Sequence, residues 1–140
     1  MDNAGITKEF LESALKEPIE KFTVNKGSAL GDGYTTLLYA VDVWKIGQDE
    51  PIHILIKCFP SNQARQQFLT EYNIFEIEVG MYDVVVPELK NFLKEKNAED
   101  IRLPFAPFYA GQTKSSVNGN SGELKFVTRL KNYNQPCNVY

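Results

Sequence analysis

Two charged side chains, Lys57 and Glu78, lie in apolar surroundings where each needs a partner of opposite charge. Lys57 lies near the end of the apolar stretch 51–60, which alternates with period two and predicts a strand. Glu78 lies in a stretch of helical spacing, and four large apolar residues flank it three and four positions away: Ile74, Phe75, Met81 and Tyr82. A core-facing carboxylate normally needs a cation, so we predict an ion pair between Lys57 and Glu78. An ammonium held in this way can bind the phosphate oxygens of a nucleotide. The alternative is a snorkelling lysine and a rim glutamate that make no mutual contact.

A glycine-rich turn precedes this pair. Gly27, Gly31 and Gly33 occur within seven residues and permit a tight turn between two predicted strands. The backbone of such a turn can approach phosphate groups, but the spacing is not Gly-x-Gly-x-x-Gly. A plain hairpin turn is the equally favoured alternative.

The remaining chemically versatile residues indicate structural roles. His53 is the single histidine, and its place in the middle of a strand favours a hydrogen-bonded strand residue over a catalytic one. Cys58 and Cys137 are far apart in sequence, so we expect reduced thiols and no zinc site.

The elements that must position these residues alternate between strand and helix patterns. Three strands are predicted to form an antiparallel meander, at Ile19–Lys26, Tyr34–Ile46 and within 51–60, the last of them central. Two more strands are predicted at Phe105–Lys114 and Glu123–Leu130, joined by the polar loop 115–122. The sequence therefore predicts an α+β fold with a five-stranded antiparallel sheet.

Helices are predicted before and after the meander. Thr7 can cap a short amphipathic helix at Lys8–Lys16. A second helix is predicted from Gln63 to Val86, with a possible break, and a third at Glu88–Lys96 after Pro87. The second helix is expected to pack on the sheet through one apolar stripe: Phe68, Tyr72, Phe75, Val79 and Tyr82.

Composition sets wider limits. A chain of 140 residues, 43% of them hydrophobic, is one domain's worth of sequence and can bury a core. The net charge is −3 and the basic residues are scattered, so neither nucleic acid nor an anionic membrane is an expected partner. No signal peptide or membrane-spanning run is evident, and we expect a cytoplasmic protein.

This order of elements resembles the small lobe of a kinase, and its details resemble the ecdysteroid-kinase-like (CHK-kinase-like) family, which shares the aminoglycoside-phosphotransferase type of kinase fold. The matching motifs are the Gly31–Thr36 run, the strand that ends in Lys57, the helix with Phe75-x-x-Glu78-x-x-x-Tyr82, and Phe105–Ala110. The sequence departs from the family pattern at Thr128-Arg129, where members usually carry an acidic pair before the hinge.

The resemblance implies a domain organisation: residues 1–130 as a kinase-like small lobe, 131–140 as a hinge or linker tail, and the large catalytic lobe absent. It also implies ATP as the ligand, with Gly27, Gly31, Gly33, Lys57 and Glu78 as its binding residues. The catalytic and Mg²⁺-binding aspartates of this fold belong to the large lobe. We therefore expect weak ATP binding, Mg²⁺ binding only with that lobe, and no catalysis by this chain alone.

The complete protein is then expected to be an ATP-dependent kinase that phosphorylates a hydroxyl group of a small molecule. An alternative of another class is a non-catalytic module whose exposed sheet and helix bind a second protein or a hydrophobic ligand. A third possibility, an unrelated α+β ligand-binding domain, requires that Lys57 and Glu78 do not pair.

Overall fold

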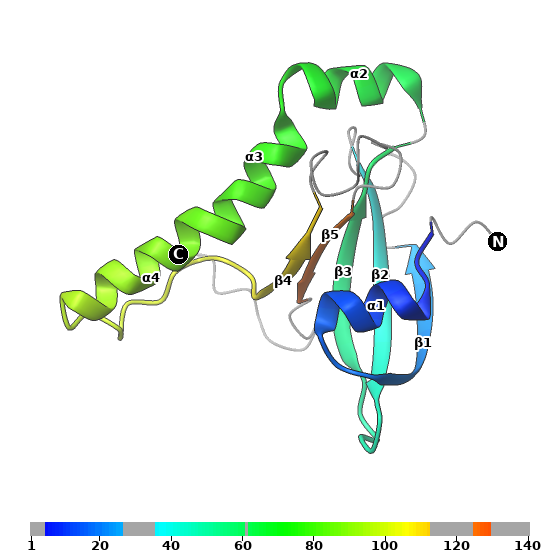
Figure 1. The fold of residues 1–140 in the computed structure, drawn as a ribbon, viewed down its shortest axis with the longest axis horizontal. Coiled ribbons are helices and arrows are strands. Elements are labelled where there is room, and N and C mark those ends of the chain that lie inside the picture. Colours follow the sequence, from blue (N-terminus) through cyan, green and yellow to red (C-terminus); the bar gives the residue numbers. More distant parts are fainter. Residues whose placement is uncertain (1–4, 27–35, 61, 113–124, 130–140) are drawn as a thin grey trace.

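The computed structural model describes residues 5–26, 36–60, 62–112 and 125–129, and it is built on a five-stranded antiparallel sheet (Figure 1). The strand order is β1-β2-β3-β5-β4. The strands are β1 (Ile19–Lys26), β2 (Leu37–Lys45), β3 (Ile52–Cys58), β4 (Phe108–Gly111) and β5 (Lys125–Arg129). The predicted α+β class, the meander of the first three strands and the central place of β3 are confirmed.

The main core lies on one face of this sheet. Alternate residues of β3, namely Ile54, Ile56 and Cys58, are buried there, and Val41 and Val43 of β2 join them. We call this cluster the sheet core. Because side chains alternate along a strand, His53, Leu55 and Lys57 share the opposite face of β3. The period-two pattern in the sequence thus determines which face Lys57 occupies.

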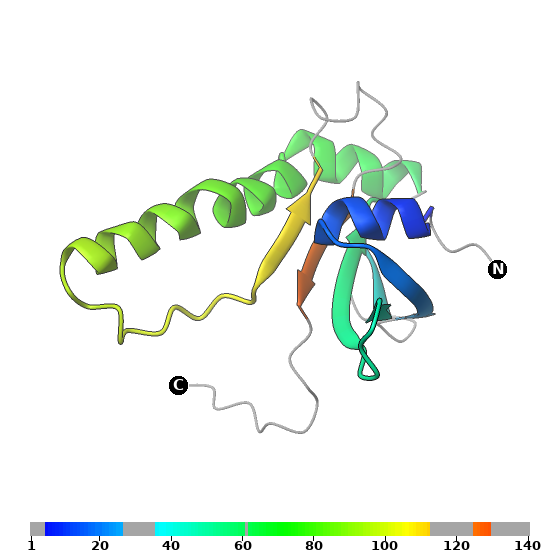
Figure 2. The ribbon, with the colours of Figure 1, turned by 60° about the horizontal axis from the view of Figure 1, so that its bottom comes forward.

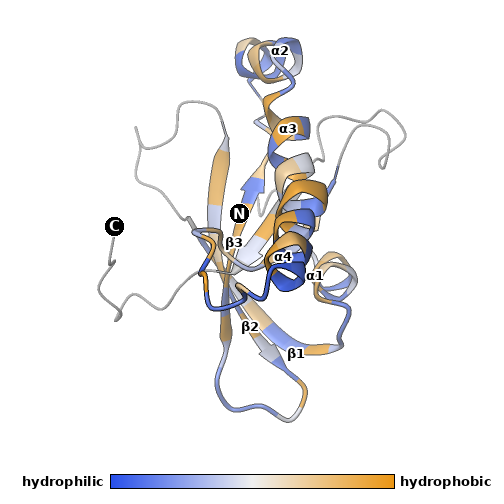
Figure 3. Cartoon of the chain, turned by 90° about the vertical axis from the view of Figure 1, so that its left-hand side faces the viewer, coloured by the Kyte–Doolittle hydropathy of each residue, from blue (hydrophilic) through white to orange (hydrophobic). Residues whose placement is uncertain are grey.

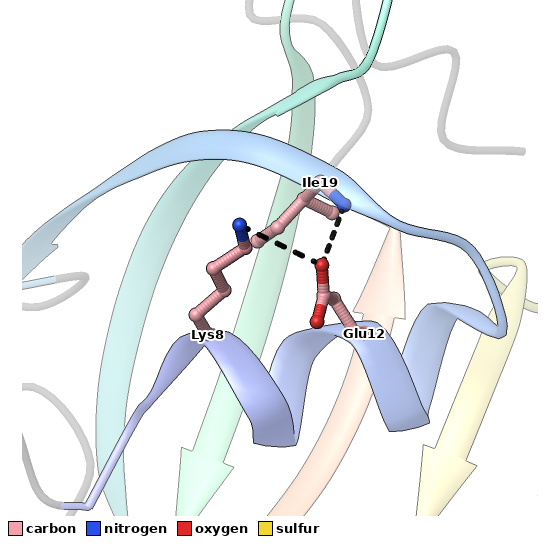
Figure 4. A network of polar contacts seen from close by, with 3 residues as sticks. All are labelled: Lys8, Glu12 and Ile19. Atoms are coloured by element: carbon pink, nitrogen blue, oxygen red, sulfur yellow. Dashed lines mark hydrogen bonds and ion pairs between the residues drawn. The ribbon is translucent and has the colours of Figure 1, made fainter.

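Helix α1 (Lys8–Leu15) covers the sheet core and contacts both edge strands, β1 and β4 (Figure 2). As predicted, the Thr7 side chain caps it by accepting a hydrogen bond from the backbone N–H of Phe10. Glu12 ties the helix to the sheet (Figure 4): its Oε1 accepts a hydrogen bond of 3.0 Å from the backbone N–H of the fully buried Ile19 and lies 3.9 Å from Nζ of Lys8. The carboxylate thus satisfies a backbone donor at the start of β1.

The region after β3 has the break that the prediction allowed within its second helix, but it lacks the predicted break at Pro87. Helix α2 (Gln63–Glu71) ends at Tyr72, and Asn73 takes a left-handed conformation (φ 51°) that bends the chain before α3 (Ile74–Gly80). The predicted break near Pro87 is wrong, because α3 continues through a π-helical turn, η1 (Met81–Val85), into α4 (Val86–Glu95). Figure 1 shows this continuous helix running away from the sheet.

The π turn explains how the helix passes a proline. Pro87 has no N–H, and in a regular α-helix its ring would crowd the carbonyl of Asp83. In η1 the backbone N–H of Val86 donates to the carbonyl of Met81, five residues earlier, which widens the helix just before the proline. Pro87 then occupies the first turn of α4, where its missing N–H costs least.

The bend also corrects the predicted apolar stripe. Phe68 and Tyr72 were expected to face the core, but they are 45% and 57% exposed and contact each other, with ring centroids 4.9 Å apart. The buried residue of α2 is Leu69. Since the left-handed Asn73 separates the axes of α2 and α3, the stripe does not continue from one helix to the other. In Figure 3, apolar and polar residues alternate along α3 and α4.

Two strands, β2 and β4, are shorter than predicted within the described residues. β4 begins at Phe108 instead of Phe105, because Pro107 cannot donate to a sheet ladder. β2 occupies Leu37–Lys45, and β5 occupies Lys125–Arg129, which is the whole described part of the strand predicted at Glu123–Leu130. The predicted glycine turn, the loop 115–122 and the tail 131–140 lie outside the described residues. No helix in the described part of the chain has both the length and the apolar character to cross a membrane.

Candidate functional site

The predicted partner residues meet at the face of β3 opposite the sheet core. Nζ of Lys57 donates a hydrogen bond to Oε1 of Glu78 on α3, and the two groups form an ion pair. Both side chains are partly open to solvent, Lys57 by 29% and Glu78 by 28%. The predicted ion pair is confirmed, and the alternative of two unconnected charges is wrong.

The surface beside Lys57 is formed by β2 and β3. Leu55 lies two residues before Lys57 on the same face, and its register partner on β2 is Ala40. Both are partly buried. Further along this face, Nδ1 of His53 and Oδ1 of Asp42 lie 2.6 Å apart, so the predicted hydrogen-bonded strand role of His53 is confirmed. The ammonium therefore borders an apolar patch, with a polar pair at its far side.

Glu78 is held in place by the packing of its helix. Phe75 and Val79 of α3 are buried in a second cluster with Phe59 and Leu69, which we call the helix core. Phe59 and Phe75 meet edge to face, with ring centroids 6.0 Å apart. Phe75 lies three residues before Glu78, and Val79 directly follows it. Their burial therefore fixes the helical turn that carries the Glu78 carboxylate.

A glycine on the neighbouring strand allows this helix to come close. A Cβ atom at Gly111 of β4 would lie 2.9 Å from both methyl groups of Val79. Only glycine leaves room for α3 at that distance from β4. Sequence reasoning did not single out Gly111, and the signal that could have identified it is its place at the end of the Phe-Tyr-Ala-Gly strand.

The site can bind an anion and orient it. A lysine ammonium presents three N–H donors, and an accepting carboxylate restricts its rotation. Its exposure allows a ligand anion to approach, while the leucine and alanine beside it offer contact to an apolar group. These properties suit a ligand that combines charged and flat apolar parts.

The other predicted binding residues, Gly27, Gly31 and Gly33, lie outside the described residues. Thr128 and Arg129 are the last two residues of β5, and Thr128 is buried, with only 6% of its surface exposed. Its register partner on β3 is Leu55, so β5 borders the same part of the sheet.

Comparison with known proteins supports the sequence resemblance. The sequence model of the ecdysteroid kinase-like family matches residues 30–118, which is more than half of the chain. The matched region contains Lys57, Glu78 and Gly111, as well as the predicted Gly31 and Gly33. Neither the curated proteins nor the solved structures gave a match. On the strength of the family match, the chain belongs to the ecdysteroid kinase-like family.

Proposed function

We propose that this chain is the nucleotide-binding small lobe of an ATP-dependent small-molecule kinase. The observation that carries the proposal is the ion pair between Lys57 on a central strand and Glu78 on the helix that follows it. In kinases, a strand lysine in this arrangement binds the α- and β-phosphates of ATP, and the glutamate holds the lysine. Membership of a kinase-like family supports the same role.

The residues around the ion pair would contact different parts of the nucleotide. Lys57 would donate to phosphate oxygens, and Glu78 would hold its ammonium in place near the end of β3. Leu55 and Ala40 would contact the flat face of the adenine ring. The turn predicted from the sequence at Gly31 and Gly33 would supply backbone N–H groups to the phosphates, as the family resemblance implies.

The proposal assigns binding, and not the chemical step, to this chain. Transfer of the γ-phosphoryl group requires an aspartate that orients the acceptor hydroxyl and a second that holds Mg²⁺, and in this fold both belong to the large lobe. Within the described residues no group of three His, Cys, Asp or Glu side chains could hold a metal ion. In this proposal, phosphotransfer depends on the two aspartates of the large lobe.

A nucleotide titration followed by NMR tests the proposal. We expect ATP to bind with a dissociation constant no better than about 1 mM, or roughly −4 kcal/mol, because half a cleft leaves most of the nucleotide in water. The amide signals of β3 and α3 should move. Lys57→Met keeps the side-chain stem, removes the charge and should abolish the binding.

Lys45→Met is the matched control. Lys45 is also a strand lysine in an ion pair, 2.5 Å from Glu17, and its side chain has a similar exposure of 26%. This substitution should leave ATP binding unchanged. Micromolar ATP binding that survives Lys57→Met, or an equal loss in both variants, would refute the proposed role of Lys57.

A further inference from the structure

A hollow of about 440 Å³ lies between α4 and the segment that follows it, away from the Lys57 site. Its size falls within the range of small-molecule sites in proteins, which is about 300–1,000 Å³. Residues of α4 form one wall, and the segment 99–105 forms the other. The ion pair of Lys57 does not contribute to it.

The hollow is fixed at the end of α4 by a helix cap. Asn97 is left-handed (φ 54°), its backbone N–H donates to the carbonyl of Lys94 at 3.1 Å, and the N–H of Ala98 donates to the carbonyl of Leu93 at 2.8 Å. These two bonds form a Schellman motif, which reverses the chain at a defined angle. The two walls are therefore set by backbone hydrogen bonds.

The far wall is held by an aromatic contact. Phe105 lines the hollow, and its ring meets that of Tyr82 edge to face, with centroids 5.8 Å apart. Tyr82 in turn packs against the helix core. The hollow is thus anchored at both ends and does not require a ligand in order to form.

Its lining combines apolar side chains with an excess of positive charge. Leu93, Ile101, Leu103 and Phe105 supply the apolar part. Lys90 and Lys94, one helical turn apart, face the hollow together with the single carboxylate of Glu99. Among the described residues, neither lysine has an ion-pair partner within 4.0 Å. Two like charges so spaced repel each other, and a bound anion would relieve that repulsion.

We propose that this hollow binds a small amphipathic carboxylate, with its apolar body against Leu93, Leu103 and Phe105 and its anionic head between Lys90 and Lys94. The lining sets this preference, because a cation would meet the two ammonium groups and a purely polar anion would leave the apolar wall uncovered. The site is independent of the proposed nucleotide site, so either one can fail without the other.

Three probes that share one tail test the proposal: octanoate, octanol and octylammonium, titrated into the chain below micelle-forming concentrations. We expect octanoate to bind at least about tenfold more tightly than either other probe, and to shift the amide signals of α4 and of 99–105. Butyrate, with the same head and a shorter tail, should bind more weakly than octanoate because it covers less of the apolar wall.

Charge variants give the second test. Replacing both lysines (Lys90→Gln with Lys94→Gln) should weaken octanoate binding about tenfold, whereas Glu99→Gln should strengthen it about threefold. Lys96→Gln, at the residue that caps α4, is the control, because Nζ of Lys96 lies over the ring of Phe92 and Lys96 does not line the hollow. All four positions are exposed, so the fold should persist.

Opposite effects of the lysine and glutamate changes, with none from Lys96→Gln, would support the site. Equal binding of octanol and octanoate, signal shifts elsewhere in the chain, or an unchanged affinity in the double lysine variant would overturn it.

Discussion

Gly111→Ala is the smallest change that should move the glutamate of the candidate site without touching it. The added Cβ would lie 2.9 Å from both methyl groups of Val79, and 3.2 Å from the tip of the Phe108 ring. Ordinary contacts of this kind begin at about 3.4 Å, so α3 or β4 must shift by about half an ångström. Val79 cannot yield easily, because it is β-branched and 4% exposed.

The expected cost follows from overpacking. Inserting a methyl group into a tight core contact costs about 1–3 kcal/mol. The lower backbone entropy of alanine in the unfolded chain offsets about 0.4–1 kcal/mol of this cost. We therefore expect Gly111→Ala to lower the free energy of unfolding by about 1–2 kcal/mol.

Gly80→Ala is the matched control, because the chain offers a second glycine next to the same residue. Gly80 ends α3 with helical φ and ψ of −60° and −37°, and an added Cβ meets nothing within 4 Å. Alanine there should stabilise the chain by about 0.5–1 kcal/mol. Urea unfolding followed by circular dichroism measures both variants.

The double variant, Gly111→Ala with Val79→Ala, isolates the contact. If the two methyl groups of Val79 cause the clash, Gly111→Ala should cost little in the Val79→Ala background, which gives a coupling energy of about 1–2 kcal/mol. The carboxyl carbon signal of Glu78 should also shift in Gly111→Ala and return in the double variant. Equal stabilities of Gly111→Ala and Gly80→Ala, or strictly additive effects, would refute the reasoning.

Two further predictions concern the helices. Glu12→Ala should lower the free energy of unfolding by about 1–3 kcal/mol, because it leaves the buried N–H of Ile19 unpaired. Lys8→Ala should lower it by no more than about 0.5 kcal/mol, and equal losses in urea unfolding would contradict the prediction. Asn73→Ala should destabilise the chain by about 1 kcal/mol and Asn73→Gly should not, because the left-handed conformation between α2 and α3 suits glycine. If urea unfolding finds Asn73→Gly less stable than Asn73→Ala, the left-handed conformation is not strained.

The features that the sequence predicted correctly depend on local patterns. The alternation of Ile52, Ile54 and Ile56 defines β3, and the apolar neighbours of Glu78 imply that it needs a cation. Lys57, near the end of that strand, was the candidate for this cation, and the ion pair confirms it. Both inferences use only neighbours along the chain, which is why they survive in the folded structure.

The features that the sequence did not predict depend on contacts between distant segments. Pro87 normally indicates a helix break, but here a π turn precedes it, and Tyr82 of that turn packs against the distant Phe105 and Phe108. The role of Gly111 exists only because α3 packs against β4. In each case the decisive partner lies more than twenty residues away or on another element.

The position of the candidate site is fixed by two different forces at adjacent residues of α3. Glu78 attracts Lys57 on β3, and Val79 meets Gly111 on β4 at a distance that only a glycine permits. An ion pair with both side chains more than a quarter exposed contributes only modestly to stability. The burial of Val79 and Phe75 must therefore hold the helix, and the ion pair then orients the ammonium on a helix already in place. It follows that loss of the Glu78 carboxylate should break this ion pair without releasing α3, whereas a change at Gly111 should move both the helix and the pair.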